Sequence, residues 1–210
     1  MPGQVGVESS ADVFVLRHGR TGLNAGGQLR GRLDVPLDEV GLTEAEGLGD
    51  TFRTVGLAVI VSSPLQRAVA TAEAVARRHG LRVETDRGFA DRDWGPWAGH
   101  AESEVAARFG TAEAAPGVEP VEQFLSRILE AVHRLTARAN GRPVMAVAHD
   151  AVNRALLAHL VPGLGDPPSI PQRTGCWNLL RRSSRAWSAP VVDAVPGDGR
   201  HPTDPPDPFP

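Results

Sequence analysis

Short apolar runs alternate along this chain with longer segments in which apolar residues recur at helical spacing. Runs rich in β-branched residues and bounded by polar or glycine-rich segments predict buried strands. The predicted strands are residues 12–16, 57–63, 81–86, 142–149, 176–182 and 186–195, and the last two are candidates for a hairpin.

Four longer segments carry the apolar stripe of an amphipathic helix. In the clearest of them, residues 121–135, an apolar side chain recurs every three or four positions. Residues 88–100 have neither period, are rich in Trp, Gly and Asp, and are expected to be irregular. The predicted helices are residues 41–56, 63–80, 121–135 and 150–163.

Polar side chains that can accept backbone N–H bonds mark two of the helix starts. Thr43 and Glu46 match a capping box for the first helix. Ser63 is the expected N-cap of the second helix, with Pro64 at its first position and Gln66 closing the box.

Alternation of strands and helices predicts an α/β fold, a three-layer sandwich with a mostly parallel sheet and helices on both faces. We expect one domain over residues 12–195. Residues 1–11 are an N-terminal tail, and residues 196–210, rich in Pro and Asp, are expected to be disordered.

The composition is that of a globular protein, with 41% hydrophobic and 22% charged residues and a net charge of -3. The absence of a basic excess argues against nucleic acid as the main partner.

A single cysteine, Cys176, excludes an intrachain disulfide and a cysteine-based metal cluster. The start lacks a signal peptide pattern and no apolar run has membrane length, so we expect a cytoplasmic protein. The oligomeric state is left open.

Polar residues suited to catalysis follow three of the predicted strands. They are Arg17 and His18 after the first strand, residues 62–67 after the second, and His149 with Asp150 after the fourth. In a parallel sheet these strand ends share one edge, where ligands bind. Two histidines and two arginines could therefore converge on one anion, and phosphate is the natural choice because Arg binds it bidentately.

The segments "LRHGRTGLN", "SSPLQRAVATA" and "VAHDAVNRALL" resemble the histidine phosphatase superfamily, whose members look like phosphoglycerate mutases. The resemblance extends over about residues 12–195. It implies that His18 is the nucleophile and that Arg17 and Arg67 bind the phosphoryl oxygens. His149 would complete the pocket, and Asn24 matches the polar residue that the family carries seven positions after the first Arg.

The chemistry implied by this resemblance requires no metal and no cofactor. A neutral imidazole attacks phosphorus, and one ring nitrogen must be held by a hydrogen bond that it donates, as we expect, to a backbone carbonyl, so that the other is free to react. Arginines stabilise the spread charge of the transition state. Water then hydrolyses the phosphohistidine.

The family also needs a carboxyl group that protonates the leaving oxygen and then activates water. In "FADRDWGPWAGH", residues Gly95, Trp97 and Gly99 align with the family pattern and put Asp91 where Glu is usual. Asp is one methylene shorter and a stronger acid, so burial or a nearby carboxylate must keep it protonated. Asp93 is the alternative acid or the perturbing neighbour.

Asp150 is a second departure, because the family often has Gly after the second histidine. We expect Asp150 to be a helix N-cap. Contact with substrate and orientation of His149 are the alternatives.

The leading hypothesis is a phosphomonoesterase acting on a small phosphorylated metabolite. A phosphoglycerate mutase is the alternative, although the short stretch after Trp97 and the absence of Tyr argue against it. A non-catalytic phosphate-binding protein is the third hypothesis. Residues 26–35 and 91–110 are expected to set specificity, and Arg30 and Arg32 could bind an acidic substrate or lie in solvent. The sequence does not name the substrate.

Overall fold

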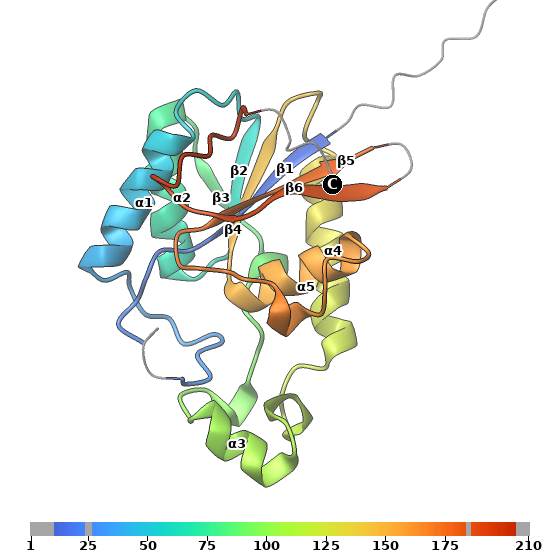
Figure 1. The fold of residues 1–210 in the computed structure, drawn as a ribbon. Coiled ribbons are helices and arrows are strands. Elements are labelled where there is room, and N and C mark those ends of the chain that lie inside the picture. Colours follow the sequence, from blue (N-terminus) through green and yellow to red (C-terminus); the bar gives the residue numbers. More distant parts are fainter. Residues whose placement is uncertain (1–10, 24–26, 184–185, 205–210) are drawn as a thin grey trace, which may run out of the picture.

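A six-stranded sheet forms the centre of the molecule in the computed structural model, which describes residues 11–23, 27–183 and 186–204. The strand order is β3-β2-β4-β1-β5-β6 (Figure 1). Strands β3, β2, β4 and β1 run parallel, while β5 is antiparallel to both β1 and β6. The predicted α/β fold class is therefore confirmed, with a mixed sheet. The strands are β1 Ala11–Arg17, β2 Val59–Ser62, β3 Val83–Thr85, β4 Val144–Ala148, β5 Trp177–Arg182 and β6 Trp187–Ala194.

Helices cover both faces of the sheet, as the continuous apolar strands require. Alternate residues of β1 belong to different cores: Phe14 packs with residues of α1 and α2, whereas Val13 packs with residues of α4 and α5. Helix α3 lies apart from the sheet at the lower end of the molecule in Figure 1. The helices are α1 Glu39–Thr51, α2 Gln66–His79, α3 Glu102–Phe109, α4 Val121–Thr136 and α5 Asp150–Leu160.

The strand register brings the predicted functional residues together. Arg17 of β1 lies opposite Ala148 of β4, and Ser62 of β2 lies opposite Val147 of β4. The carboxyl ends of three adjacent strands thus coincide, with β4 in the middle. His18, His149 and the start of α2 all leave the sheet at this edge.

Both predicted caps are wrong. Helix α1 begins at Glu39, because Asp38 accepts the N–H of Gly41 at 2.9 Å and forms the N-cap instead of Thr43. Helix α2 begins at Gln66, and its N-cap, Leu65, makes no side-chain bond. Ser63 therefore lies outside the helix that it was expected to cap. Helix α3 was not predicted.

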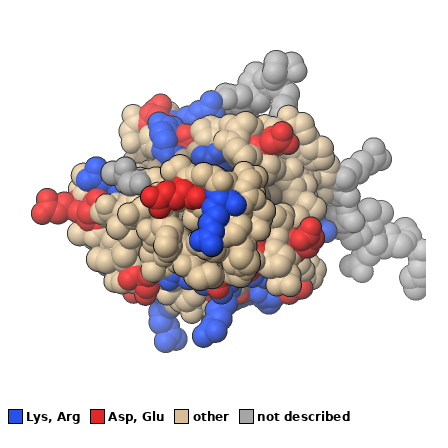
Figure 2. All heavy atoms as spheres, turned by 90° about the horizontal axis from the view of Figure 1, so that it is seen from below, with Lys and Arg blue, Asp and Glu red and all other residues tan. Residues whose placement is uncertain are grey.

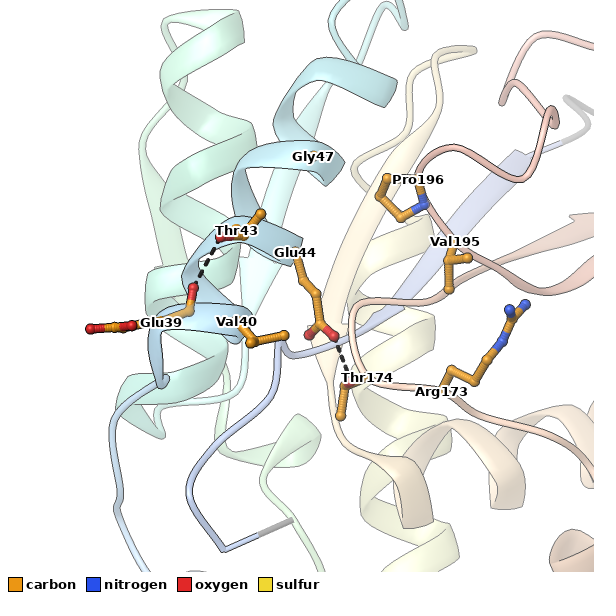
Figure 3. Close-up of a pocket in the computed structure, with 9 residues that line it drawn as sticks. All are labelled: Glu39, Val40, Thr43, Glu44, Gly47, Arg173, Thr174, Val195 and Pro196. Carbon is orange, nitrogen blue, oxygen red and sulfur yellow. Dashed lines mark hydrogen bonds between the residues drawn. The ribbon is translucent and has the colours of Figure 1, made fainter. Parts of the chain in front are cut away.

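The C-terminal segment after β6 returns to α1. Residues 195–199 and 202–204 form turns, and Pro202 is buried. An open groove of about 850 Å³ lies between α1, the segment before β5 and the segment after β6 (Figure 3). Residues 1–10 and 205–210 of the two predicted tails lie outside the described residues, and the domain limits stay predictions. In the part of the chain that the structure describes, no helix is long and apolar enough to cross a bilayer.

Two glycines allow α1 to touch the loop that follows β1. A Cβ added to Gly41 would lie 2.0 Å from the carbonyl oxygen of Arg20, and one added to Gly19 would lie 2.3 Å from that of Gly41. Both contacts are to backbone, which cannot move aside as a flexible side chain can. Helix α1 is therefore seated directly against the residues next to His18.

We expect Gly41→Ala to destabilise the protein by about 1–3 kcal/mol through overpacking. Helix propensity alone predicts the opposite sign, since Ala is favoured over Gly in a helix by about 1 kcal/mol. Urea unfolding distinguishes the two. Gly56→Ala is the control, because its Cβ would meet nothing within 4 Å. If Gly41→Ala is as stable as the control, the backbone contact does not constrain the fold.

Candidate active site

His18 is buried at the end of β1, with 3% of its surface exposed. Its Nδ1 lies 2.7 Å from the carbonyl oxygen of Gly19, and because a carbonyl only accepts, Nδ1 carries the ring proton. The main chain is fixed as well: its N–H donates to Ala148 at 3.1 Å, and its carbonyl accepts from Gly175 at 3.1 Å. The unprotonated Nε2 is thus held in one direction, in the arrangement that the sequence predicted for a nucleophile.

Arg67 of α2 donates to this free nitrogen, with its Nε 3.2 Å from His18 Nε2. The rest of its buried guanidinium is held by backbone carbonyls: Nη1 donates to Leu33 at 2.7 Å and Nη2 to Gly31 at 2.8 Å. Burial, together with the positive charges of Arg67 and Arg17, holds the pKa of His18 well below its usual value. His18 is therefore neutral at physiological pH.

Arg17 is buried beside His18 at the end of the same strand. Its Nη1 donates to the carbonyl of Gln172 and pairs with Asp150 Oδ2 at 3.2 Å. Its Nε is buried and has no hydrogen-bond partner among the described residues. A buried guanidinium N–H without an acceptor is costly, so this group fits an anionic ligand.

His149 follows the central strand β4 and is fully buried. Its Nε2 lies 2.7 Å from the hydroxyl of Ser63, and its ring centroid is 5.1 Å from that of His18. Nδ1 is buried, has no hydrogen-bond partner in the described structure and lies 3.8 Å from Asp91 Oδ2. Burial, followed by electrostatic interaction with His18 when that ring is protonated and with Arg67 and Arg17, holds the pKa of His149 well below its usual value.

Ser63 belongs to residues 62–67, which the sequence placed at this edge of the sheet, but its expected role there was that of a helix cap. Its hydroxyl accepts the N–H of Leu65 at 3.3 Å and lies 2.7 Å from His149 Nε2. Nδ1 of His149 is the second buried nitrogen of the site, after Arg17 Nε, that has no hydrogen-bond partner among the described residues.

The two candidate acids have different environments. Asp91 is buried, with Oδ2 3.3 Å from Arg67 Nη2, and burial raises its pKa although Arg67 and the N–H of Arg92 act in the opposite direction. Asp93 is half-exposed and pairs with Arg32 Nη1 at 2.8 Å. The structure brings Asp91, and not Asp93, to His149 and Arg67.

Asp150 is not an N-cap, contrary to expectation: the N-cap of α5 is His149, and Asp150 is the first helical residue. Its carboxylate pairs with Arg17 and with Arg154 one turn further on. An ion pair with a residue far away in sequence has replaced the local cap. Asn24 lies outside the described residues, so its predicted role stays a prediction.

A buried amide cluster behind Arg17 had no signal in the sequence motifs. Gln172 Oε1 accepts from Asn153 at 2.9 Å and from Asn178 at 3.1 Å, and Gln172 Nε2 donates to Asn178 Oδ1 at 2.8 Å. The main-chain carbonyl of Gln172 accepts from Arg17. The cluster therefore helps to fix the position of that guanidinium. Buried amides inside apolar helix and strand segments were the only available hint.

Glu44 of α1 links the loops on either side of His18 (Figure 3). It accepts from the backbone N–H of Arg20 at 2.7 Å and from the hydroxyl of Thr174 at 2.8 Å. Glu44 and Thr174 line the groove of Figure 3, whereas the two histidines, Arg17 and Arg67 do not.

Charge on the surrounding surface is mixed. Figure 2 views the molecule from below, and its Arg and acidic side chains are scattered among uncharged residues without a broad patch of one sign. Across the described ranges, no group of three or more His, Cys, Asp or Glu could hold a metal ion.

The comparisons agree with one another on the family. The model of the histidine phosphatase superfamily (branch 1) matches residues 13–193. A glucosyl-3-phosphoglycerate phosphatase of Mycolicibacterium vanbaalenii is 34% identical over 71% of this chain and 73% of its own length. The uncharacterized phosphatase PhoE of Bacillus subtilis is 27% identical over 83% of this chain and 90% of its own. The native structure of a mycobacterial glucosyl-3-phosphoglycerate phosphatase superposes with a TM-score of 0.78 at 28% identity, covering 89% of this chain and all (100%) of that one.

We expect the free energy of unfolding to decrease as the pH falls from about 7 to about 5. Both buried histidines stay neutral in the folded protein, whereas in the unfolded chain they take up protons near pH 6.5. Their contribution to stability is therefore complete above about pH 6.5 and is lost below it, by up to about 1.4 kcal/mol per pH unit for each histidine.

Urea unfolding at several pH values measures this slope. In His149→Gln the slope between about pH 6.5 and 5 should be smaller by up to about 1.4 kcal/mol per pH unit, the contribution of one histidine. An unchanged slope in both His149→Gln and His18→Gln would mean that neither imidazole is held neutral.

Proposed function

This chain belongs to the histidine phosphatase superfamily, and on that premise we propose that it hydrolyses phosphate monoesters through a phosphohistidine on His18. The activity follows from the family and from relatives that are named phosphatases: the protein is a hydrolase with small phosphorylated substrates. The observation that carries the mechanism is the pinned imidazole of His18, with Nδ1 bound to Gly19 and Nε2 facing Arg67.

The first step transfers the phosphoryl group to the enzyme. Arg17 Nε, Arg67 and His149 Nδ1 bind the phosphoryl oxygens, and the two nitrogens without partners support this role. Nε2 of His18 attacks phosphorus as the P–O bond to the alcohol breaks. Protonated Asp91 gives its proton to the leaving oxygen, which its raised pKa makes possible.

The second step releases phosphate. Asp91, now a carboxylate, takes a proton from water as the water oxygen attacks phosphorus and the P–N bond breaks. Inorganic phosphate leaves, His18 is neutral again, and Asp91 is protonated for the next cycle. Each group returns to its starting state, so the cycle uses neither a metal nor a cofactor.

We further propose that the preferred substrate carries a second acidic group near its phosphate. The mycobacterial relatives are named for a phosphoglycerate derivative, which has a carboxylate. Arg30 is half-buried and has no ion pair among the described residues, whereas Arg32 is held by Asp93 and Glu119. Burial and the charge of Arg17 lower the pKa of Arg30, so the two cations lie within electrostatic range of each other.

A cytoplasmic location and the absence of nucleic-acid and membrane partners stay predictions from the sequence.

His18→Ala should abolish hydrolysis of para-nitrophenyl phosphate, with a loss of at least about a thousandfold, because no other group can form the covalent intermediate. His133→Ala, at an exposed position of α4, is the matched control and should keep full activity. Rapid quench in alkaline denaturant, in which the P–N bond of phosphohistidine survives, should trap labelled phosphate on the wild type only. Isomerisation of phosphoglycerates without release of phosphate would favour a mutase, and tight phosphate binding without turnover would favour a binding protein.

Asp91→Asn should reduce kcat/KM for phenyl phosphate by roughly 100-fold and change it much less for para-nitrophenyl phosphate. Nitrophenolate leaves without a proton, whereas phenolate is a poorer leaving group that needs the acid. Asp93→Asn is the control. If only Asp93→Asn shows this selectivity, Asp93 is the acid.

Arg30→Gln should raise KM for 3-phosphoglycerate by about tenfold, because a charge-assisted hydrogen bond contributes about 1.5–3 kcal/mol. Its KM for para-nitrophenyl phosphate should stay within about twofold of the wild type. Arg32→Gln provides the comparison and should affect both substrates equally. Equal effects of Arg30→Gln on the two substrates would contradict a second anion subsite.

A further inference from the structure

Arg127 of α4 holds the segment that carries Asp91. Its Nη1 donates to the carbonyl of Gly88 at 2.8 Å and to that of Ala90 at 2.7 Å. Its Nη2 donates to the carbonyl of Asp91 itself at 3.0 Å. One side chain thus satisfies three backbone acceptors within four consecutive residues.

Glu119 holds Arg127 from the other side. Arg127 Nε donates to Glu119 Oε1 at 2.6 Å, and Nη2 donates to Oε2 at 2.9 Å. Together with the three carbonyls, these bonds use all five N–H groups of the guanidinium. Lysine carries its donors on a single nitrogen and cannot reproduce this pattern.

Glu119 also binds the segment directly beyond Asp91. Its Oε2 accepts the N–H of Asp93 at 3.0 Å, and its own N–H donates to the carbonyl of Asp93 at 2.8 Å. Its carbonyl accepts from the Arg92 side chain at 3.1 and 3.3 Å. Residues 88–93 form no strand or long helix. The bonds from Arg127 and Glu119 therefore hold this segment where regular backbone hydrogen bonds would otherwise do so.

The pair is largely shielded from water, with 19% of the Arg127 side chain and 10% of the Glu119 side chain exposed. Burial opposes charge on Glu119, but the hydrogen bonds from Arg127 and from Asp93 hold its pKa below the usual value. Removing Glu119 would leave Arg127 without its carboxylate, and removing Arg127 would leave Glu119 with only Arg32, at 3.5 Å, as a cationic partner.

Asp91 depends on its backbone more than a glutamate would. Its carboxylate lies 3.3 Å from Arg67 and 3.8 Å from His149. The Asp side chain has only two torsions, which cannot compensate for a displacement of the main chain. A misplacement of about 1 Å in a reacting group can cost about 100-fold in rate.

We propose that Arg127, braced by Glu119, is the positioning residue for the general acid Asp91. The inference rests on the proposed function, in which Asp91 protonates the leaving group.

The test compares two aryl esters that differ only in the leaving group. Arg127→Lys should lower kcat/KM for phenyl phosphate by roughly 10- to 100-fold and leave that for para-nitrophenyl phosphate within about threefold. The ratio kcat/KM reports the transfer to His18 and not the later hydrolysis. Arg134→Lys is the control, because it alters an exposed Arg of the same helix that pairs with Asp86. In this variant, kcat/KM for phenyl phosphate relative to that for para-nitrophenyl phosphate should equal the wild-type value.

A purely structural role would lower kcat/KM for both esters alike. The proposal is therefore overturned if Arg127→Lys causes an equal loss for the two esters, or no loss for either. Thermal unfolding of each variant shows whether it is folded. If Arg127→Lys does not fold, Glu119→Gln is the second variant, because Gln keeps an acceptor for the N–H of Asp93. It should show the same selectivity in a weaker form.

A double-mutant cycle separates this proposal from the one on which it rests. In the Asp91→Asn background, Arg127→Lys should cause no further selective loss with phenyl phosphate. If Asp91→Asn is not selective at all, the acid assignment fails. If Asp91→Asn is selective and Arg127→Lys is not, only the positioning role fails.

Discussion

Burial of two arginines among two neutral imidazoles is the constraint on which the whole site depends. A guanidinium cannot give up its proton, so each buried Arg must find acceptors. Arg67 takes carbonyls of the loop 31–33 and the carboxylate of Asp91, and Arg17 takes the carbonyl of Gln172 and Asp150. The loops around the sheet edge thus supply oxygen atoms, while burial and the same positive charge hold the pKa values of both histidines low and leave His18 a neutral nucleophile.

Arginine is also the general cross-linking residue of this protein. The sequence contains no lysine, so all 22 basic residues are arginines. Beyond the site, Arg142 and Arg154 donate to backbone carbonyls of other segments, as Arg127 does to the acid segment. A planar fork can join several acceptors where loops lack regular backbone pairing, which an ammonium group does less well.

The sequence predicted the parts of the structure that are encoded locally. Apolar periodicity located the strands and the four long helices, and three motifs at strand ends identified the residues that the sheet brings together, because parallel strands share one edge. Two of the errors have a common cause: Ser63 and Asp150 carry the residue types of helix caps, but Ser63 pairs with His149 and Asp150 with Arg17, which are distant in sequence. The third cap, Thr43, is displaced by the nearby Asp38. The roles of Arg127 and Glu119 could not be predicted, because their partners lie in a segment without periodicity.

The position of β4 in the sheet divides the site into two halves that differ in local stability. His18 and His149 leave adjacent strands in the middle of the sheet, the kind of region whose amide hydrogens are the most protected from exchange. Asp91 belongs to a segment that is held by bonds from Arg127 of α4 and from Glu119 in place of a strand ladder. We therefore expect the phosphate-binding half to outlast the acid half when the protein opens locally. Under mild heating or denaturant, such a protein retains its affinity for phosphate after its ability to expel poor leaving groups has begun to fail.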